Sequence, residues 1–355
     1  MQVVSLIVSL YIMSPHILII YTGGTIGMKQ DPQSGALVPF NFWQITEEVP
    51  ELKRFDYQLD ALSFTPLVDS SDIRPDFWIQ LAQTIKQHYD TYDGFVVLMG
   101  TDTMAYTASA LSFMLEDLEK PVVFTGSQLP IGMLRTDGKE NFISAVEMAA
   151  AKGPDGRPQV PEVCIFFENQ LFRGNRTTKY SAEQFNAFRS PNFPPLAEAG
   201  IRIKYNNGFI RYPETWGKPL KIHTSLCCDL AIIKLFPGIQ EKTVKGILAI
   251  PGLRAVILET YGSGNAPTLP WLIQALKNAI EGGILVCNVS QCHAGSVAME
   301  TYATGILLKH AGVLGGHDIT TESAVAKIIL LTGQYNDNKI INEKFDTNIR
   351  GEISI

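Results

Sequence analysis

The stretch ILIIYTGGTIG, residues 17–27, places a short apolar strand directly before a glycine-rich turn. An apolar run without alternation is typical of a strand buried on both faces of a sheet. From His16 onward, short apolar strands alternate with amphipathic helices, and this pattern predicts parallel sheets with helices on both sides. The expected fold class is therefore α/β, with two Rossmann-like domains, the larger N-terminal and the smaller C-terminal.

Periodicity predicts the individual elements on either side of this stretch. The expected strands are 17–21, 58–66, 95–99, 122–125, 162–167, 229–235, 255–260 and 284–290, and the expected helices are 76–89, 103–118, 138–152, 269–280 and 321–331. Residues 169–180 are expected to form a loop or a hairpin. Periodicity fades and prolines cluster between 190 and 224, which indicates strand ends and then a linker.

A chain of 355 residues is too long for one compact core, so two domains are expected. We predict an N-terminal domain over 14–212, a linker over 213–226 and a C-terminal domain over 227–355. Residues 1–13 are expected to be an extension, with Met13 the more natural start. Residues 1–11 contain no Lys or Arg, unlike a secretory signal, and Pro15 interrupts the apolar run, so we expect a cytoplasmic protein.

The composition and charge of the chain limit the classes of molecule that it is expected to bind. The formal charge is -6 and no run of Lys and Arg occurs, so binding of nucleic acid or of a membrane surface is not expected. Five cysteines form no CxxC pair and are read as reduced thiols. Cys292 and His293 are adjacent, but no further ligands stand at suitable spacing, so no metal site is expected.

Four predicted strand-exit turns are rich in hydroxyls and carboxylates, namely TGGTIG (22–27), DSSD (69–72), GTDT (100–103) and TGSQ (125–128). Ligands of parallel sheets bind at the carboxyl ends of the strands, which is where these turns fall. The first turn lacks both the lysine of a P-loop and GxGxxG spacing, which disfavours a nucleotide site. Thr25 beside the backbone of Gly24 would suit a nucleophile with an oxyanion hole, and a threonine-capped tight turn is the alternative.

A threonine hydroxyl needs a base within hydrogen-bond reach to act at neutral pH. Thr101 and Asp102 offer a second hydroxyl beside a carboxylate, and a lysine could relay the proton with its charge balanced by that carboxylate. Lys179, in RGNRTTK at 173–179, is the best candidate, although its position alone favours a solvated lysine, as most lysines are.

These five motifs, in this order, resemble those of the bacterial-type asparaginases, specifically the cytoplasmic type I group. The resemblance extends from about Pro15 to the C-terminus. It implies that Thr25 is the nucleophile and that Thr101, Asp102 and Lys179 form a second triad. It also implies a cofactor-free and metal-free amide hydrolase that converts L-asparagine to L-aspartate and ammonia through a threonine acyl-enzyme.

The zwitterionic substrate requires a site that matches both of its charges. A carboxylate such as Asp102 suits the ammonium group, while Ser70 and Ser71 suit the α-carboxylate. Asp69 is expected to shape its loop rather than to touch the substrate. The residues of the predicted substrate site are Gly24, Asp69, Ser70, Ser71, Thr101, Asp102 and Asn265.

The resemblance also implies a homotetramer built as a dimer of dimers, in which Asn265 reaches into a neighbour's site. One departure concerns the tyrosine that the family usually places after the nucleophile, because Ala36 and Leu37 stand near the expected position. The open alternatives are a glutaminase-asparaginase, an amidotransferase subunit and a non-catalytic Rossmann-like metabolite-binding protein.

Overall fold

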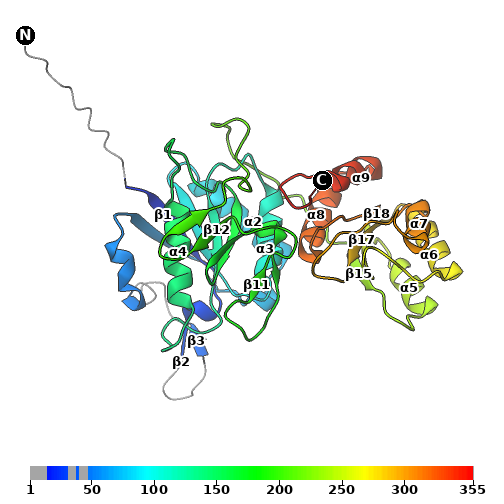
Figure 1. The fold of residues 1–355 in the computed structure, drawn as a ribbon, viewed down its shortest axis with the longest axis horizontal. Helices are drawn as coiled ribbons and strands as arrows, with labels where there is room; N and C mark the ends of the chain where they lie inside the picture. Colours follow the sequence, from blue (N-terminus) through cyan, green and yellow to red (C-terminus); the bar gives the residue numbers. More distant parts are fainter. Residues whose placement is uncertain (1–13, 31–36, 40–46, 355) are drawn as a thin grey trace, which may run out of the picture.

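The computed structural model describes residues 14–30, 37–39 and 47–354. These residues contain two separate principal sheets, one of eight strands and one of four (Figure 1). The eight-stranded sheet is built from strands between His16 and Tyr205, and the four-stranded sheet from strands between Leu230 and Gly315. The α/β fold class is therefore confirmed, with a larger N-terminal and a smaller C-terminal unit. The expected extension, residues 1–13, lies outside the described residues.

The large sheet has a parallel half and an antiparallel half. Its order is β13-β12-β9-β8-β7-β5-β1-β4, and the pairs from β8 to β4 are all parallel. The strands are β1 (His16–Tyr21), β4 (Gln58–Ser63), β5 (Gly94–Leu98), β7 (Val122–Thr125), β8 (Val163–Phe167), β9 (Gln170–Arg173), β12 (Ala197–Ala199) and β13 (Ile203–Tyr205). Because β4, β1, β5 and β7 are parallel neighbours, their carboxyl ends lie side by side at one edge.

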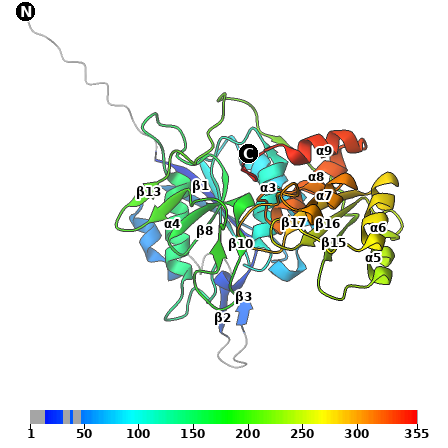
Figure 2. The ribbon, with the colours of Figure 1, turned by 45° about the vertical axis from the view of Figure 1, so that its right-hand side comes forward.

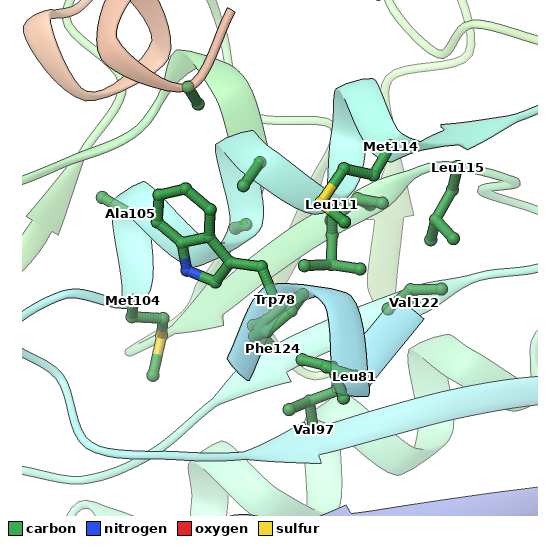
Figure 3. Packing of buried hydrophobic residues seen from close by; sticks show 14 of the residues in the cluster. Trp78, Leu81, Val97, Met104, Ala105, Leu111, Met114, Leu115, Val122 and Phe124 are labelled. Atoms are coloured by element: carbon green, nitrogen blue, oxygen red, sulfur yellow. The ribbon is translucent and has the colours of Figure 1, made fainter. Parts of the chain in front are cut away.

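Helices cover both faces of this sheet: α2 (Pro75–His88) and α3 (Met104–Met114) on one face, and α4 (Gly138–Ala150) on the other. Successive residues of β1 point to opposite faces, so Leu18 packs with α2 and α3 while Ile19 packs with α4. Figure 3 shows the first of these cores, with Trp78 and Leu111 between the helices and the sheet. Burial on both faces explains why β1 is apolar without alternation.

The small sheet is entirely parallel, in the order β15-β16-β17-β18. Its strands are β15 (Leu230–Lys234), β16 (Ala255–Thr260), β17 (Leu285–Ser290) and β18 (Leu314–Gly315). Helices α5 (Glu241–Leu248), α6 (Pro270–Glu281) and α7 (Ala303–His310) share one core with this sheet, and α8 (Thr321–Gln334) and α9 (Asn338–Asp346) pack on its other face.

Helix α8 joins the two units. Ala326 and Ile329 of α8 belong to the same buried cluster as Ala105 and Ala108 of α3, and both ribbon views place α8 beside α3 (Figure 2). A helix packed on two sides must be apolar around most of its circumference, which accounts for the nearly complete burial of α3. The C-terminal unit is therefore packed directly against a helix that follows the GTDT turn.

The predicted helix over 103–118 was too long at its C-terminal end. Helix α3 ends at Met114, because the next two residues form β6 (Leu115–Glu116), which pairs with β14 (Lys221–Ile222). Residues 169–180 contain the hairpin strand β9, which is antiparallel to β8, as one of the two expectations had it. Three helices, α5, α7 and α9, were not predicted.

Short elements complete the structure: β2 (Met28–Gln30) with β3 (Leu37–Pro39), β10 (Thr178–Lys179) with β11 (Phe188–Arg189), and the 3-10 turns η1 (Thr25–Gly27), η2 (Pro50–Arg54), η3 (Ser70–Asp72) and η4 (Gly174–Arg176). Among the helices of the described ranges, none combines the length and the apolar character needed to span a bilayer.

Candidate active site

The four polar turns meet at the carboxyl edge of the large sheet. The first follows β1, and its backbone is bonded to the turns on either side. The N–H of Thr22 donates to the carbonyl of Leu98, at 2.9 Å, and the N–H of Val68 donates to the carbonyl of Thr22, at 2.8 Å. Gly24 has φ +91, and a Cβ there would overlap the backbone of Gly100. Glycine is required at this position because the TGGT and GTDT turns touch backbone to backbone.

Thr25 is half-buried and opens the 3-10 turn η1. Within the described residues, no hydrogen bond occupies the backbone N–H of Gly24 or of Thr101. Backbone N–H groups without a protein partner, beside a hydroxyl, are the elements that an oxyanion hole for a threonine nucleophile would need.

Tyr21, the last residue of β1, is hydrogen-bonded to the TGGTIG turn that follows it. Its buried hydroxyl donates to the carbonyl of Gly27, at 3.1 Å, and burial raises the pKa of Tyr21 to about 12. A phenol with this pKa stays protonated at neutral pH, and in this form the Tyr21 hydroxyl holds the turn by its bond to Gly27.

The segment expected to lack the family tyrosine is 31–41, and residues 31–36 and 40–41 lie outside the described residues. Ala36 is among them. Leu37 belongs to β3, whose backbone pairs with β2, and its side chain is likewise outside the description.

Lys179 lies beside the GTDT turn, 77 and 78 residues away in sequence. Its Nζ donates to Oγ1 of Thr101, at 2.8 Å, and to Oδ1 of Asp102, at 2.6 Å. The Lys179 side chain is 19% exposed, whereas that of Asp102 is 62% exposed. The Lys179 ammonium is thus mostly buried. The Asp102 carboxylate that balances its charge faces solvent, where a charged ligand can reach it.

The DSSD turn packs against the GTDT turn through Ser70. This serine is buried, its hydroxyl lies 3.4 Å from the N–H of Asp102, and its carbonyl accepts from the hydroxyl of Thr103, at 2.6 Å. Asp69 accepts from both the N–H and the hydroxyl of Ser71, at 2.8 Å each. These bonds hold the pKa of Asp69 below its ordinary value. The Asp69 carboxylate therefore organises its own loop.

Two residues that the sequence reasoning did not single out hold the TGSQ turn. Buried Asp137 accepts from the N–H groups of Gln128 and Leu129 and from the side-chain amide of Asn141. Asn141 in turn donates to the carbonyl of Gly126, at 3.0 Å. The only signal in the sequence was the acidic residue directly before the predicted helix at 138, a position that favours helix capping.

Asn265 is not among the residues that meet at this edge within one chain. It closes a turn with Tyr261 in the small unit, and its side-chain oxygen accepts from Thr304, at 2.7 Å. Over the ranges that the structure describes, no three His, Cys, Asp or Glu side chains are grouped so that they could hold a metal ion.

Comparisons with known proteins place this geometry in a family. A family model described as "Asparaginase, N-terminal" matches residues 16–211, and one described as "Glutaminase/Asparaginase C-terminal domain" matches residues 229–345. The chain belongs to the asparaginase family. It is 45% identical to L-asparaginase 1 of Escherichia coli over 340 residues, which cover 95% of this chain and 98% of that protein.

The chain is also similar to a solved structure and to a longer mammalian protein. The crystal structure of L-asparaginase I from Vibrio cholerae superposes with a TM-score of 0.87 at 41% identity, covering 96% of this chain and all of that one. The 60 kDa lysophospholipase of Mus musculus is 43% identical over 96% of this chain, which spans 63% of the mouse protein. The family and the asparaginase relatives identify the chain as an amidohydrolase.

Proposed function

We propose that this amidohydrolase converts L-asparagine to L-aspartate and ammonia by a double displacement through an acyl-enzyme on Thr25. The observation that carries the proposal is the contact of Lys179 with both Thr101 and Asp102, beside a TGGT turn that touches the GTDT turn. This arrangement brings two hydroxyls, a lysine and a carboxylate to one edge of the sheet, which supports the proposed proton relay.

In the first displacement, Oγ1 of Thr25 attacks the side-chain amide carbon of the substrate. Backbone N–H groups near Gly24 and Thr101 stabilise the negative charge on the amide oxygen. The threonine proton passes to the departing nitrogen, the C–N bond breaks, and ammonia leaves an ester between Thr25 and the aspartyl group.

In the second displacement, water attacks the carbonyl carbon of that ester. Thr101 accepts a proton from the water while its own proton passes to the Lys179 amine, which must first have released one proton to solvent; the distance between Nζ and Oγ1 is 2.8 Å. The ester bond breaks, Thr25 regains its proton from Lys179 through the same relay, and L-aspartate is released.

The substrate's two charges are proposed to meet different turns. The solvent-facing carboxylate of Asp102 would bind the α-ammonium group. Ser70, Ser71 and nearby backbone N–H groups would bind the α-carboxylate, with Asp69 holding their loop in shape. The reaction needs no metal or cofactor.

We further propose that the enzyme is a cytoplasmic homotetramer, a dimer of dimers. In such an assembly Asn265 would complete the site of a neighbouring subunit, which fits its position away from the four turns of its own chain. The domain boundaries near 212 and 227 belong to the same proposal.

The test is ammonia release by the purified protein from L-asparagine and from L-glutamine, compared with that of Thr25→Ala. We expect a higher rate with L-asparagine and a loss on the order of a thousandfold or more in Thr25→Ala. Thr243→Ala, which changes an exposed threonine of α5, is the matched control and should match wild type. Equal rates in wild type and Thr25→Ala would refute the nucleophile, and a higher rate with L-glutamine would favour the glutaminase alternative.

A further inference from the structure

The segment that delivers Lys179 is held by the C-terminal part of the chain. Residues 173–179 leave β9, pass through the turn η4 and end in β10. Asn175 and Arg176 in this turn are almost completely buried, at 0% and 2% exposure. Buried polar side chains need partners, and those of η4 come largely from residues after 317.

Arg176 makes three contacts with the C-terminal part of the chain. Its Nε donates to the carbonyl of Gly351, at 2.6 Å, one terminal nitrogen pairs with Asp318 at 2.8 Å, and the other donates to Ser354 at 3.1 Å. The side-chain amide of Asn175 donates to the carbonyl of Arg350, at 3.1 Å. The η4 turn is therefore fastened to the turn formed by residues 348–354.

That C-terminal turn is itself organised by a buried ion pair. Glu352 accepts from the N–H groups of Ile349 and Arg350, and it pairs with Lys327 of α8 at 2.5 Å, both side chains being fully buried. Burial raises the pKa of Glu352, but the ammonium and the two N–H groups lower it more, so that the pKa lies below its ordinary value. The Glu352 carboxylate thus ties the C-terminal turn to α8 through bonds to both.

A second contact holds the segment 173–179, and it is made by Thr178, one residue before Lys179. The hydroxyl of Thr178 donates to a carboxylate oxygen of Glu322, at 2.6 Å, and Glu322 belongs to the first turn of α8. Successive residues of a strand point to opposite faces. Thr178 therefore anchors β10 to α8 while Lys179 points to Thr101 and Asp102.

We propose that Glu322 and the C-terminal turn 348–354 act as positioning residues that hold β10 so that Lys179 reaches Thr101. The inference rests on the catalytic role proposed for Lys179. A lysine side chain has several rotatable bonds, so its Nζ is placed only as accurately as its backbone is. A displacement of about 1 Å in a catalytic group can cost on the order of a hundredfold in rate.

The first test uses two substitutions of Thr178 that oppose each other. Thr178→Val keeps the shape and removes the hydroxyl, whereas Thr178→Ser keeps the hydroxyl and removes a methyl group. If the bond to Glu322 positions the strand, kcat falls by about tenfold or more in Thr178→Val and stays within about threefold of wild type in Thr178→Ser. KM should change less than kcat in Thr178→Val. The reverse order, or equal kcat in the two variants, would overturn this side of the proposal.

The second test perturbs the C-terminal turn. Gly351 has φ +83, and a Cβ there would overlap the guanidinium of Arg173, whereas Gly252 has φ +80 and open space around it. Gly351→Ala and Gly252→Ala therefore impose similar backbone strain, and only the first pushes on the turn next to η4. We expect a drop in kcat in Gly351→Ala alone. Equal kcat in the two variants would contradict the proposal.

A measurement of Lys179 that does not depend on turnover separates the failure of this inference from the failure of the proposed function. Trace acetylation followed by peptide mass spectrometry reports how accessible the Lys179 amine is. It should be protected in wild type and Thr178→Ser and label faster in Thr178→Val. Unchanged labelling in Thr178→Val would refute the positioning role, whatever the activity measurements show. Full activity in Thr25→Ala would refute the proposed chemistry and leave the labelling result unaffected.

Discussion

Replacing Lys179 with methionine removes an ammonium group and leaves an aliphatic chain of similar length. In the wild-type structure that ammonium donates to Thr101 and to Asp102, at 2.8 and 2.6 Å. The variant keeps the stem of the side chain and loses both bonds. It therefore isolates the proton relay from the packing around β10.

The structure separates the expected effects on rate and on stability. A positioned acid or base contributes about 10²- to 10⁴-fold to a rate, which corresponds to about 2.7–5.4 kcal/mol in the activation barrier. The Asp102 side chain is 62% exposed, so water can solvate it once its partner is gone. Loss of such a screened pair costs about 1 kcal/mol or less in the free energy of unfolding.

The assay is steady-state ammonia release from L-asparagine together with thermal unfolding of the same samples. Lys204→Met, at the exposed central residue of strand β13, is the control and should match wild type in both measurements. We expect Lys179→Met to unfold within a few degrees of wild type while kcat falls by at least about a hundredfold. A folded Lys179→Met variant with kcat within threefold of wild type would refute the relay.

Two further predictions concern ion pairs away from the proposed site. Lys327→Met should lower the free energy of unfolding by about 3–5 kcal/mol, because it leaves Glu352 buried without its cation; denaturant titration should show recovery when Glu352→Gln is added, and a double variant as unstable as the single one would contradict this. Hydrogen bonds from Lys221, the larger effect, and from His223 lower the pKa of Glu116 from 4.5 to about 2. A lowered carboxyl pKa stabilises the fold above pH 4.5 and loses that effect as the pH falls towards 2, so Glu116→Gln should cost roughly 1 kcal/mol at pH 7 and nothing below pH 2; a deficit that persists in acid would contradict the assignment.

The order of strands and helices could be predicted from the sequence where burial is the deciding force. Residues 122–125 and 255–260 are strands with the predicted bounds, because each apolar run is buried between layers that cover both faces of its sheet. The end of α3 could not be predicted. It depends on β14, more than a hundred residues later, whose backbone takes Leu115 and Glu116 out of the helix.

In the candidate site, too, local features could be predicted from the sequence, and features that depend on distant residues could not. The four polar turns could be found because parallel strands present their exits at one edge, and the contact of Lys179 with Thr101 followed from family resemblance rather than from position. The roles of Asp137 and Glu322 could not be predicted, because each depends on a partner that only the folded chain brings close. The sequence alone does not distinguish an acidic residue that is buried from one that is exposed to solvent.

The most direct test of the central claim is to trap the acyl-enzyme. Wild-type protein mixed with L-asparagine and quenched with acid within one turnover would be digested and analysed by mass spectrometry. The account predicts a mass gain of one aspartyl group on the peptide that contains Thr25, and no such gain in Thr25→Ala. An aspartyl group found on another residue, or undiminished turnover by Thr25→Ala, would contradict it.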